Sequence, residues 1–196
     1  MKERPILFSA PMVRAILAGT KTQTRRALKP QPQINGGDGL HPVRPYQTPQ
    51  GKWTWVLAST GHGDGTSGEW CPYGMEGDRF WVRETFAEAE MGKAKAIYYK
   101  ADEEKPEWLK GFWRPSIFMP RALSRITLEI TDVRVERLQE ISEEDAIAEG
   151  AIITSKYEKS HIEAFCGIWE RINGESAWRD NPWVWAITFK HLQGAS

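Results

Sequence analysis

The chain has 196 residues, which is enough for one domain with a substantial hydrophobic core or for one compact domain that carries insertions. Its 26 Lys and Arg balance 26 Asp and Glu, which excludes a uniformly basic nucleic-acid binder, so any contact with nucleic acid has to be local. The apolar run over residues 5–18 is broken by Pro11 and Arg14, so we expect neither a membrane span nor a signal peptide and place the protein in the cytoplasm.

The N-terminal part of the chain predicts a strand, a helix and a charged loop. Residues 5–9, PILFS, are typical of a short strand. The helix expected over residues 10–19 has Pro11 in its first turn and Gly19 as its C-terminal cap. The loop expected at 20–26, TKTQTRR, then places three basic residues and three threonines in one turn.

Two stretches of different composition interrupt this pattern and are interpreted as insertions. Residues 29–77 are rich in Pro, Gly and polar side chains around one strand-like run, KWTWVLA, which is typical of a flap with a hairpin. Residues 101–122 break the alternation a second time. The strand patterns at 77–86 and 94–102 lie between them and are expected to pair near each other. We therefore predict a single domain, 1–196, with these two insertions.

Residues 125–138, RITLEITDVRVERL, carry the strongest pattern in the chain. Apolar and polar side chains alternate for more than ten residues, and the apolar ones share one side if a bulge occurs near Thr131 and Asp132. This pattern predicts a long strand at the centre of a sheet.

Two helices and a closing strand follow. The helix expected over 142–150 has Ser142 as its N-cap, an acidic first turn and Gly150 as its C-cap. A second helix is expected over 160–174, and residues 182–190 are strand-like. The apolar stripe of the second helix consists of Ile162, Phe165, Ile168, Trp169 and Ile172. The order of elements predicts an α+β fold, a small twisted β-barrel with helices at its mouth.

Several of these runs together resemble the ASCH domain, a relative of the RNA-binding PUA fold. The resemblance rests on ILAGTKTQTRR, GDRFWVRE, ITDVRVERLQEISEEDAIAEGA and WVWAITFKHL, and it spans the chain. The motifs CPYG and PSIFMPR are similar to those of ASCH proteins encoded by phages and prophages. The resemblance implies a PUA-like barrel in which the two insertions belong to the phage-like branch.

The family's motif, Gly-x-Lys-x-x-Thr-x-Arg, falls on Gly19, Lys21, Thr24 and Arg26. In the small bacterial acetylcytidine amidohydrolase, an ASCH enzyme, the lysine and threonine of this motif act with a glutamate from the helix after the long strand. Glu149 is the matching residue in this chain. The resemblance therefore implies Lys21, Thr24 and Glu149 as catalytic residues.

These residue types suit the hydrolysis of an amide. Thr24 supplies the attacking oxygen, and Lys21 acts as the base if burial or the neighbouring charges lower its pKa. Glu149, in the last turn of its helix, faces the negative end of the helix dipole, which favours its protonated form and suits it to deliver a proton. Arg25 and Arg26 are predicted to bind substrate, Arg26 through its fork of donors.

Other interpretations of the same residues stay open. Arg83 and Glu84, at the end of the GDRFWVRE strand, are further substrate-binding candidates for this cleft, or else a surface ion pair. The loop at Lys21 is also compatible with a solvated turn. It equally suits a non-catalytic reader that grips phosphate and stacks a base of RNA or a modified nucleoside. A ribonuclease would use the same cleft.

No metal and no cofactor are predicted. Cys71 and Cys166 lie far apart without paired spacing, and His62 with Cys71 lacks a third and a fourth zinc ligand. Most of the ten tryptophans are expected in the core, and a base-stacking role stays open for one or two of them. The expected ligand is a nucleotide, a modified nucleoside or single-stranded RNA, with no membrane partner. Hydrolysis of an acylated cytidine is the most specific function, and the sequence leaves protein partners unknown.

Overall fold

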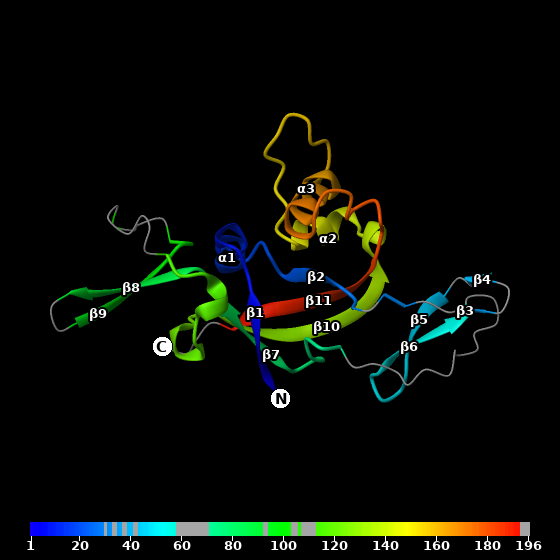
Figure 1. Ribbon diagram of the computed structural model, residues 1–196, viewed down its shortest axis with the longest axis horizontal. Coiled ribbons are helices and arrows are strands. Elements are labelled where there is room, and N and C mark those ends of the chain that lie inside the picture. The colour runs from blue at the N-terminus through cyan, green and yellow to red at the C-terminus, as the bar shows by residue number, and fades with distance from the viewer. Residues whose placement is uncertain are drawn as a thin grey trace.

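The computed structural model describes residues 1–29, 31–32, 35–36, 39–40, 43–57, 71–91, 94–102, 106 and 113–192. The chain is a mixed α+β protein built around a five-stranded sheet with the strand order β1-β7-β10-β11-β2 (Figure 1). The strands are β1 Glu3–Leu7, β2 Gln23–Ala27, β3 Asn35–Gly36, β4 Gly39–Leu40, β5 Val43–Gln47, β6 Trp53–Leu57, β7 Arg79–Arg83, β8 Phe86–Met91, β9 Ala94–Tyr99, β10 Thr127–Arg137 and β11 Trp183–Leu192. The helices are α1 Ala10–Leu17, η2 Ser116–Phe118, η3 Arg121–Leu123, η4 Leu138–Glu140, α2 Glu143–Ala148 and α3 His161–Asn173.

Strand β10 is the central strand of this sheet, as its alternating pattern predicts. It pairs antiparallel with β11 along its whole length and with β7 at its first residues. The register shifts between Ile130 and Asp132, which confirms the predicted bulge. On the core side Ile126, Leu128 and Ile130 are completely buried.

The charged segment that was expected to be a loop forms an edge strand instead. Residues Gln23–Ala27 make up β2, which pairs antiparallel with β11 so that Thr24 lies opposite Ile187 and Arg26 opposite Trp185. The expectation of a loop was wrong. It relied on the polar side chains of this segment, whereas the strand forms because the backbone N–H and C=O groups of the segment pair with the open edge of β11. Within the described part of the chain no ladder joins β2 to β1, so backbone pairing leaves the sheet open and does not close the predicted barrel.

The three α-helices lie along one side of the sheet (Figure 1). Helix α1 has its proline in the first turn and ends before Gly19, whose φ is +75°. Helix α2 begins after Ser142, whose side chain accepts a hydrogen bond from the N–H of Asp145, as the sequence predicts. Ser160 caps α3 in the same way through the N–H of Glu163. A second apolar cluster joins these two helices to Val184 of β11.

Two hairpins stand at opposite ends of the sheet, β5–β6 at one end and β8–β9 at the other (Figure 1). The β5–β6 hairpin lies inside the first predicted insertion, yet it packs onto the main core. The ring of Trp53 lies 6.3 Å from that of Trp185, and the ring of Trp55 lies 5.1 Å from that of Trp183. His62 of the same insertion lies outside the described residues.

The core of β10 provides a direct test of this packing. Leu128 has no exposed surface, so Leu128→Ala removes buried methyl groups and leaves a cavity that the sheet cannot fill. We expect the free energy of unfolding, measured by urea denaturation, to fall by about 2–5 kcal/mol. The matched control is Leu17→Ala at the end of α1, where the side chain is 46% exposed and the loss should be small. Equal losses in the two variants would contradict this assignment of the core.

Candidate functional site

Lys21 and Glu149 form a buried ion pair between segments that are 128 positions apart in the sequence. Lys21 Nζ lies 2.8 Å from Glu149 Oε2, and the two side chains are 0% and 4% exposed. The ammonium also donates to the carbonyl oxygens of Glu149 at 2.7 Å and of Gln23 at 2.8 Å. All three N–H donors of the protonated lysine therefore have an acceptor.

The backbone holds the two segments together at the same place. Lys21 and Glu149 form an isolated antiparallel bridge, and the N–H of Thr22 donates to the carbonyl of Ala148. Gly150 follows with φ of +78°, and a Cβ there would lie 3.2 Å from the Cβ atoms of both Ala15 and Lys21. Only glycine suits that combination of conformation and close approach. The cap of α2 therefore fixes where Glu149 meets Lys21.

Arg25 is surrounded by three carboxylates rather than left open to a ligand. Its guanidinium lies 2.6 Å from Glu136, 2.7 Å from Asp145 and 3.3 Å from Glu149, and its side chain has no exposed surface. A further donor goes to the Gln23 side chain at 2.6 Å. We call this group the ion cluster, and its members are Lys21, Arg25, Arg134, Glu136, Asp145 and Glu149. The structure thus places Arg25, predicted as a substrate-binding residue, where it holds Glu149.

Arg26 takes a different environment one residue further along β2. Its guanidinium lies over the ring of Phe8 at 5.5 Å and donates to the carbonyl of Leu7 at 3.1 Å. Burial lowers its pKa from the ordinary arginine value, and the carboxylate of Glu149 opposes that shift. An arginine remains protonated under such conditions, so Arg26 is a fixed cation at this site.

Burial also lowers the pKa of Lys21 below that of an ordinary lysine. The carboxylate of Glu149 opposes this shift, while the positive charges of Arg26 and Arg25 add to it. A lysine in these surroundings gives up its proton more readily than one in water. This is the electrostatic property that a lysine acting as a base requires.

A small cavity of about 130 Å³ opens beside the ion cluster, between α1, β2 and α3. We call it the inner cavity. Its polar side is formed by Thr24, Arg25, Arg26 and Glu149. The remaining lining residues are Met12, Ala27, Phe165, Ile168, Trp169, Ile172 and Asn173. The arrangement combines the Thr24 hydroxyl, the Glu149 carboxylate and the Arg26 guanidinium with an apolar wall, while the side chains of Lys21 and Arg25 have no exposed surface.

Thr24 lines the inner cavity from the edge strand and is 2% exposed. Among the described residues no hydrogen bond joins its hydroxyl to Lys21 Nζ, whose donors go to Gln23 and Glu149. The structure thus brings Thr24 and Glu149 to one cavity and Lys21 to Glu149. Lys21 Nζ can take a proton from Thr24 only after it breaks one of its three present hydrogen bonds and turns toward the Thr24 hydroxyl.

Arg83 and Glu84 do not line the inner cavity, contrary to expectation. Arg83 Nε donates to the carbonyl of Met119 at 3.0 Å, and its Nη2 donates to the carbonyl of Ile117. Glu84 is 1% exposed and paired with Arg125 at 2.9 Å; burial raises its pKa, and Arg125 opposes this. Both side chains therefore hold the segment after residue 113 against the sheet. Their positions in the sequence could not show which partners Arg83 and Glu84 have, because consecutive residues at the end of a strand point to opposite faces of the sheet.

The wall that α3 contributes was not recognised from the sequence. The pattern predicts Ile172 as part of a buried stripe, yet it is 56% exposed and borders the inner cavity. Ile168 and Trp169 of the same stripe also line the cavity. The helical period shows which residues share a face, but only the position of β2 shows that this face is partly uncovered.

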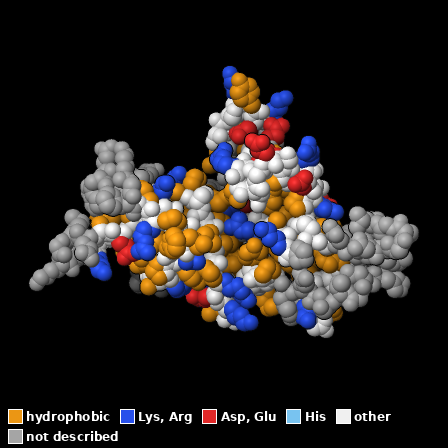
Figure 2. Space-filling model, in the orientation of Figure 1, with side chains coloured by type: hydrophobic (Ala, Val, Ile, Leu, Met, Phe, Trp, Pro, Cys, Tyr) orange, Lys and Arg blue, Asp and Glu red, His pale blue; other side chains and the backbone are white. Residues whose placement is uncertain are grey.

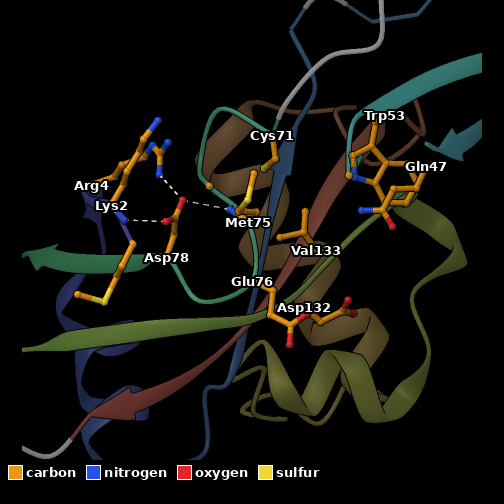
Figure 3. A pocket seen from close by; sticks show the side chains of 13 residues that line it. Lys2, Arg4, Gln47, Trp53, Cys71, Met75, Glu76, Asp78, Asp132 and Val133 are labelled. Atoms are coloured by element: carbon orange, nitrogen blue, oxygen red, sulfur yellow. Dashed lines mark hydrogen bonds and ion pairs between the residues drawn. The ribbon is translucent and has the colours of Figure 1, made fainter. Parts of the chain in front are cut away.

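A larger cavity of about 540 Å³ lies elsewhere, between the start of β1, the turn before β7 and the β5–β6 hairpin (Figure 3). Asp78 lies in its wall beside Lys2 and Arg4 and accepts hydrogen bonds from Lys2 N, Arg4 Nη1 and Met75 N. Burial opposes ionisation of Asp78, but these bonds hold its pKa below the usual range. Burial raises the pKa of Cys71 in the same wall to about 11, so this thiol is a poor nucleophile at neutral pH. None of the predicted catalytic residues lines this cavity.

The described residues contain no group of three or more His, Cys, Asp and Glu arranged to hold a metal ion. Where the chain is described, its helices are too short or too polar to cross a bilayer.

No family model matches the sequence, and no curated protein is significantly similar to it. Among solved structures, the chain is similar to a high-resolution crystal structure of an ASCH domain from Lactobacillus crispatus JV V101. The similarity covers 97% of this chain and 79% of that chain, with 14% sequence identity and a TM-score of 0.40.

The pair between Lys21 and Glu149 predicts a strong coupling in stability. Glu149→Gln leaves a buried lysine without its carboxylate, so we expect the free energy of unfolding to fall by about 3–5 kcal/mol. The double variant with Lys21→Met should lose less than the sum of the single losses, by about 0.5–3 kcal/mol, because the buried ammonium is then absent. Glu129→Gln, which breaks the exposed pair with Lys190, is the matched control and should be nearly silent. A Glu149→Gln protein as stable as this control would contradict the role of the buried pair.

The lowered pKa of Lys21 predicts how stability depends on pH. Between the folded-state pKa and the ordinary value of 10.5, the unfolded chain binds more protons than the folded chain. The contribution of Lys21 to the free energy of unfolding is therefore fully present above pH 10.5, and it is lost as the pH falls through the pKa of Lys21 in the folded state. Urea denaturation across this window should show the stability of the parent rising with pH relative to Lys21→Met. A difference between the two proteins that stays constant with pH would show that Lys21 keeps an ordinary pKa.

Proposed function

We propose that this chain is an ASCH-type protein that binds a nucleotide or modified nucleoside in the inner cavity and hydrolyses the amide of an acylated cytidine. The observation that carries the proposal is the meeting of Thr24 and Glu149 at one cavity, with Lys21 bonded directly to Glu149 behind it. The sequence motif supports the same three residues. A hydroxyl, a carboxylate and a lysine of lowered pKa are the groups that amide hydrolysis needs.

The proposed reaction begins when the Thr24 hydroxyl attacks the acyl carbon and its proton passes to neutral Lys21. The carbon–nitrogen bond breaks as the protonated Lys21–Glu149 pair returns that proton to the leaving amine. A water molecule then attacks the acyl–threonine ester, which releases the carboxylic acid and restores the hydroxyl. The net change is one amide and one water converted to one amine and one acid.

Arg26 stabilises the charge that develops in this reaction. The attack places negative charge on the acyl oxygen, and a fixed guanidinium at the edge of the cavity offers N–H donors to it. The apolar wall from α3 excludes water and strengthens this interaction, because charges attract more strongly in a medium of low dielectric constant. Arg25 acts indirectly, since its donors already go to the carboxylates of the ion cluster.

A non-catalytic reader of RNA or a modified base is the second candidate, and one observation favours it. Lys21 Nζ has three acceptors, and each oxygen of the Glu149 side chain already has a cationic partner. A network so fully satisfied is typical of a rigid support rather than of a base that changes its partners. The enzymatic proposal therefore requires that Lys21 changes partners when substrate binds, as catalytic hydrogen bonds often form only in the substrate complex.

The two candidates are separated by conservative variants of Lys21 and Thr24. Lys21→Arg keeps the positive charge but cannot deprotonate, so turnover of N4-acetylcytidine should collapse while ligand affinity falls by about tenfold or less. Thr24→Val preserves shape and removes only the hydroxyl, and should behave in the same way. Thr22→Val, at an exposed neighbouring position, is the matched control and should retain activity. Products are measured by mass, and circular dichroism checks that each variant is folded.

The reader hypothesis predicts a different set of results. The parent would release no cytidine yet bind RNA, Lys21→Arg would bind nearly as well, and Arg26→Ala would weaken binding in a salt-dependent way. That combination would refute the enzymatic proposal. Cleavage of unmodified RNA by the parent would refute it in favour of a ribonuclease.

A further inference from the structure

A second hollow lies next to the inner cavity, beside α3. It measures about 520 Å³ and shares Ala27, Trp169 and Asn173 with the inner cavity, so the two are adjacent. We call it the outer groove. Its other lining residues are Lys29, Gln31, Pro32, Arg137, Ala177, Asp180, Pro182 and Trp183. Figure 2 shows Lys and Arg side chains across the middle of the face that carries β2, bordered by hydrophobic side chains.

The sizes of the two spaces imply that they divide one ligand. Sites that enclose a whole small molecule measure about 300–1,000 Å³. The inner cavity, at about 130 Å³, has room for one planar ring with a small acyl group but not for a sugar and its phosphates. The outer groove is adjacent to the inner cavity and is about four times as large, so it offers the room for whatever is attached to the ring.

The outer groove has the charge and the groups that suit a nucleotide backbone. Lys29 is exposed, and Arg137 lies over the ring of Trp183 at 4.4 Å while donating to the carbonyl of Asn181 at 3.0 Å. A guanidinium stacked on an aromatic ring keeps its N–H donors in its own plane, where they can meet phosphate oxygens. Among the described residues of the lining, Asp180 is the one acidic side chain, against these two cations.

The wall that carries these cations is held in place before any ligand arrives. The N–H of Leu28 donates to the carbonyl of Trp183 at 3.0 Å. The Gln31 side chain donates to the carbonyls of Leu28 and Trp183 and accepts from the N–H of Trp183 at 2.8 Å. Lys29 therefore extends from a segment fixed on both sides, which reduces the entropy lost when it binds a phosphate.

Two donors in the same wall have no hydrogen-bond partner among the described residues. The indole nitrogens of Trp169 and Trp183 are buried, and within the described part of the chain neither has a hydrogen-bond acceptor. Native structures leave few buried donors unpaired. Both residues line the outer groove, so a bound oxygen atom can satisfy these groups after a small movement of the side chains.

We propose that the outer groove binds the nucleotide next to the one whose base enters the inner cavity, so that the substrate is single-stranded RNA rather than a free nucleoside. This inference rests on the proposed function for its assignment of the acylated base to the inner cavity. Lys29 and Arg137 hold the phosphate between the two nucleotides, and the groove takes the second one. A base-paired strand does not fit, because a base that enters the inner cavity has to leave its stack.

The test compares two substrates that carry the same acylated base. One is N4-acetylcytidine, and the other is a short single-stranded oligoribonucleotide with one N4-acetylcytidine in the middle. We expect kcat/KM for the oligonucleotide to exceed that for the nucleoside by about tenfold or more, since hydrogen bonds to a charged group are each worth that much. Lys29→Ala should bring the ratio of the two kcat/KM values close to one. It should also reduce the slope of RNA affinity against salt concentration by about one released counterion.

Two further variants make the test specific. Lys95→Ala, an exposed lysine on the β8–β9 hairpin far from α3, is the matched control and should leave the ratio unchanged. Arg137→Lys keeps the charge and loses the planar stack on Trp183, so it should give an intermediate ratio. Oligonucleotide affinity is measured in parallel by fluorescence anisotropy, with a polyglutamate peptide as a competitor.

The outcomes separate this inference from the proposed function. Equal kcat/KM for both substrates, unchanged by Lys29→Ala, would overturn the outer groove as a binding site and leave the hydrolase intact. No turnover of either substrate, with RNA affinity that still depends on Lys29, would overturn the hydrolase and support the groove. Displacement of RNA by polyglutamate at equal charge concentration would also overturn the inference, because the groove would then bind charge and not nucleotides.

Discussion

The buried ion pair between Lys21 and Glu149 is the interaction on which the rest of the site depends. The lysine has no exposed surface, and its three donors meet two oxygens of Glu149 and one of Gln23. A buried charge without such partners is strongly destabilising, so the segment after α1 and the end of α2 have to stay together. Glu149, and Arg25 through its own pair with Glu149, are positioned in the wall of the inner cavity by this contact.

The ion cluster extends the same constraint to the sheet. Arg25 projects from the edge strand β2 and meets Glu136 of β10 and Asp145 of α2 as well as Glu149. One guanidinium therefore links a sheet edge, a central strand and a helix, and its desolvation is compensated by several carboxylates at once. This explains how a segment as charged as TKTQTRR is ordered within the fold. Charges that look like solvated surface in the sequence are internal supports in the structure.

The two adjacent hollows differ in charge although the chain as a whole is neutral. Negative side chains of the ion cluster balance Lys21 and Arg25, whereas Arg26 lines the inner cavity and Lys29 and Arg137 line the outer groove. The inner cavity is small and partly apolar, and the outer groove is wide and cationic. Under the proposed function the first recognises a base by shape and chemistry, and the second binds the backbone by charge.

The sequence by itself determined the features whose energies are local. Ser142 and Ser160 cap their helices, and the bulge near Asp132 interrupts β10, because caps and side-chain alternation depend on residues a few positions apart. The tertiary structure alone decided that TKTQTRR supplies an edge strand, that Arg83 turns away from the inner cavity and that Ile172 borders it uncovered. The reason is physical: a charged or apolar side chain takes whatever partner the fold brings within a few ångströms, and spacing along the chain does not show which partner that is.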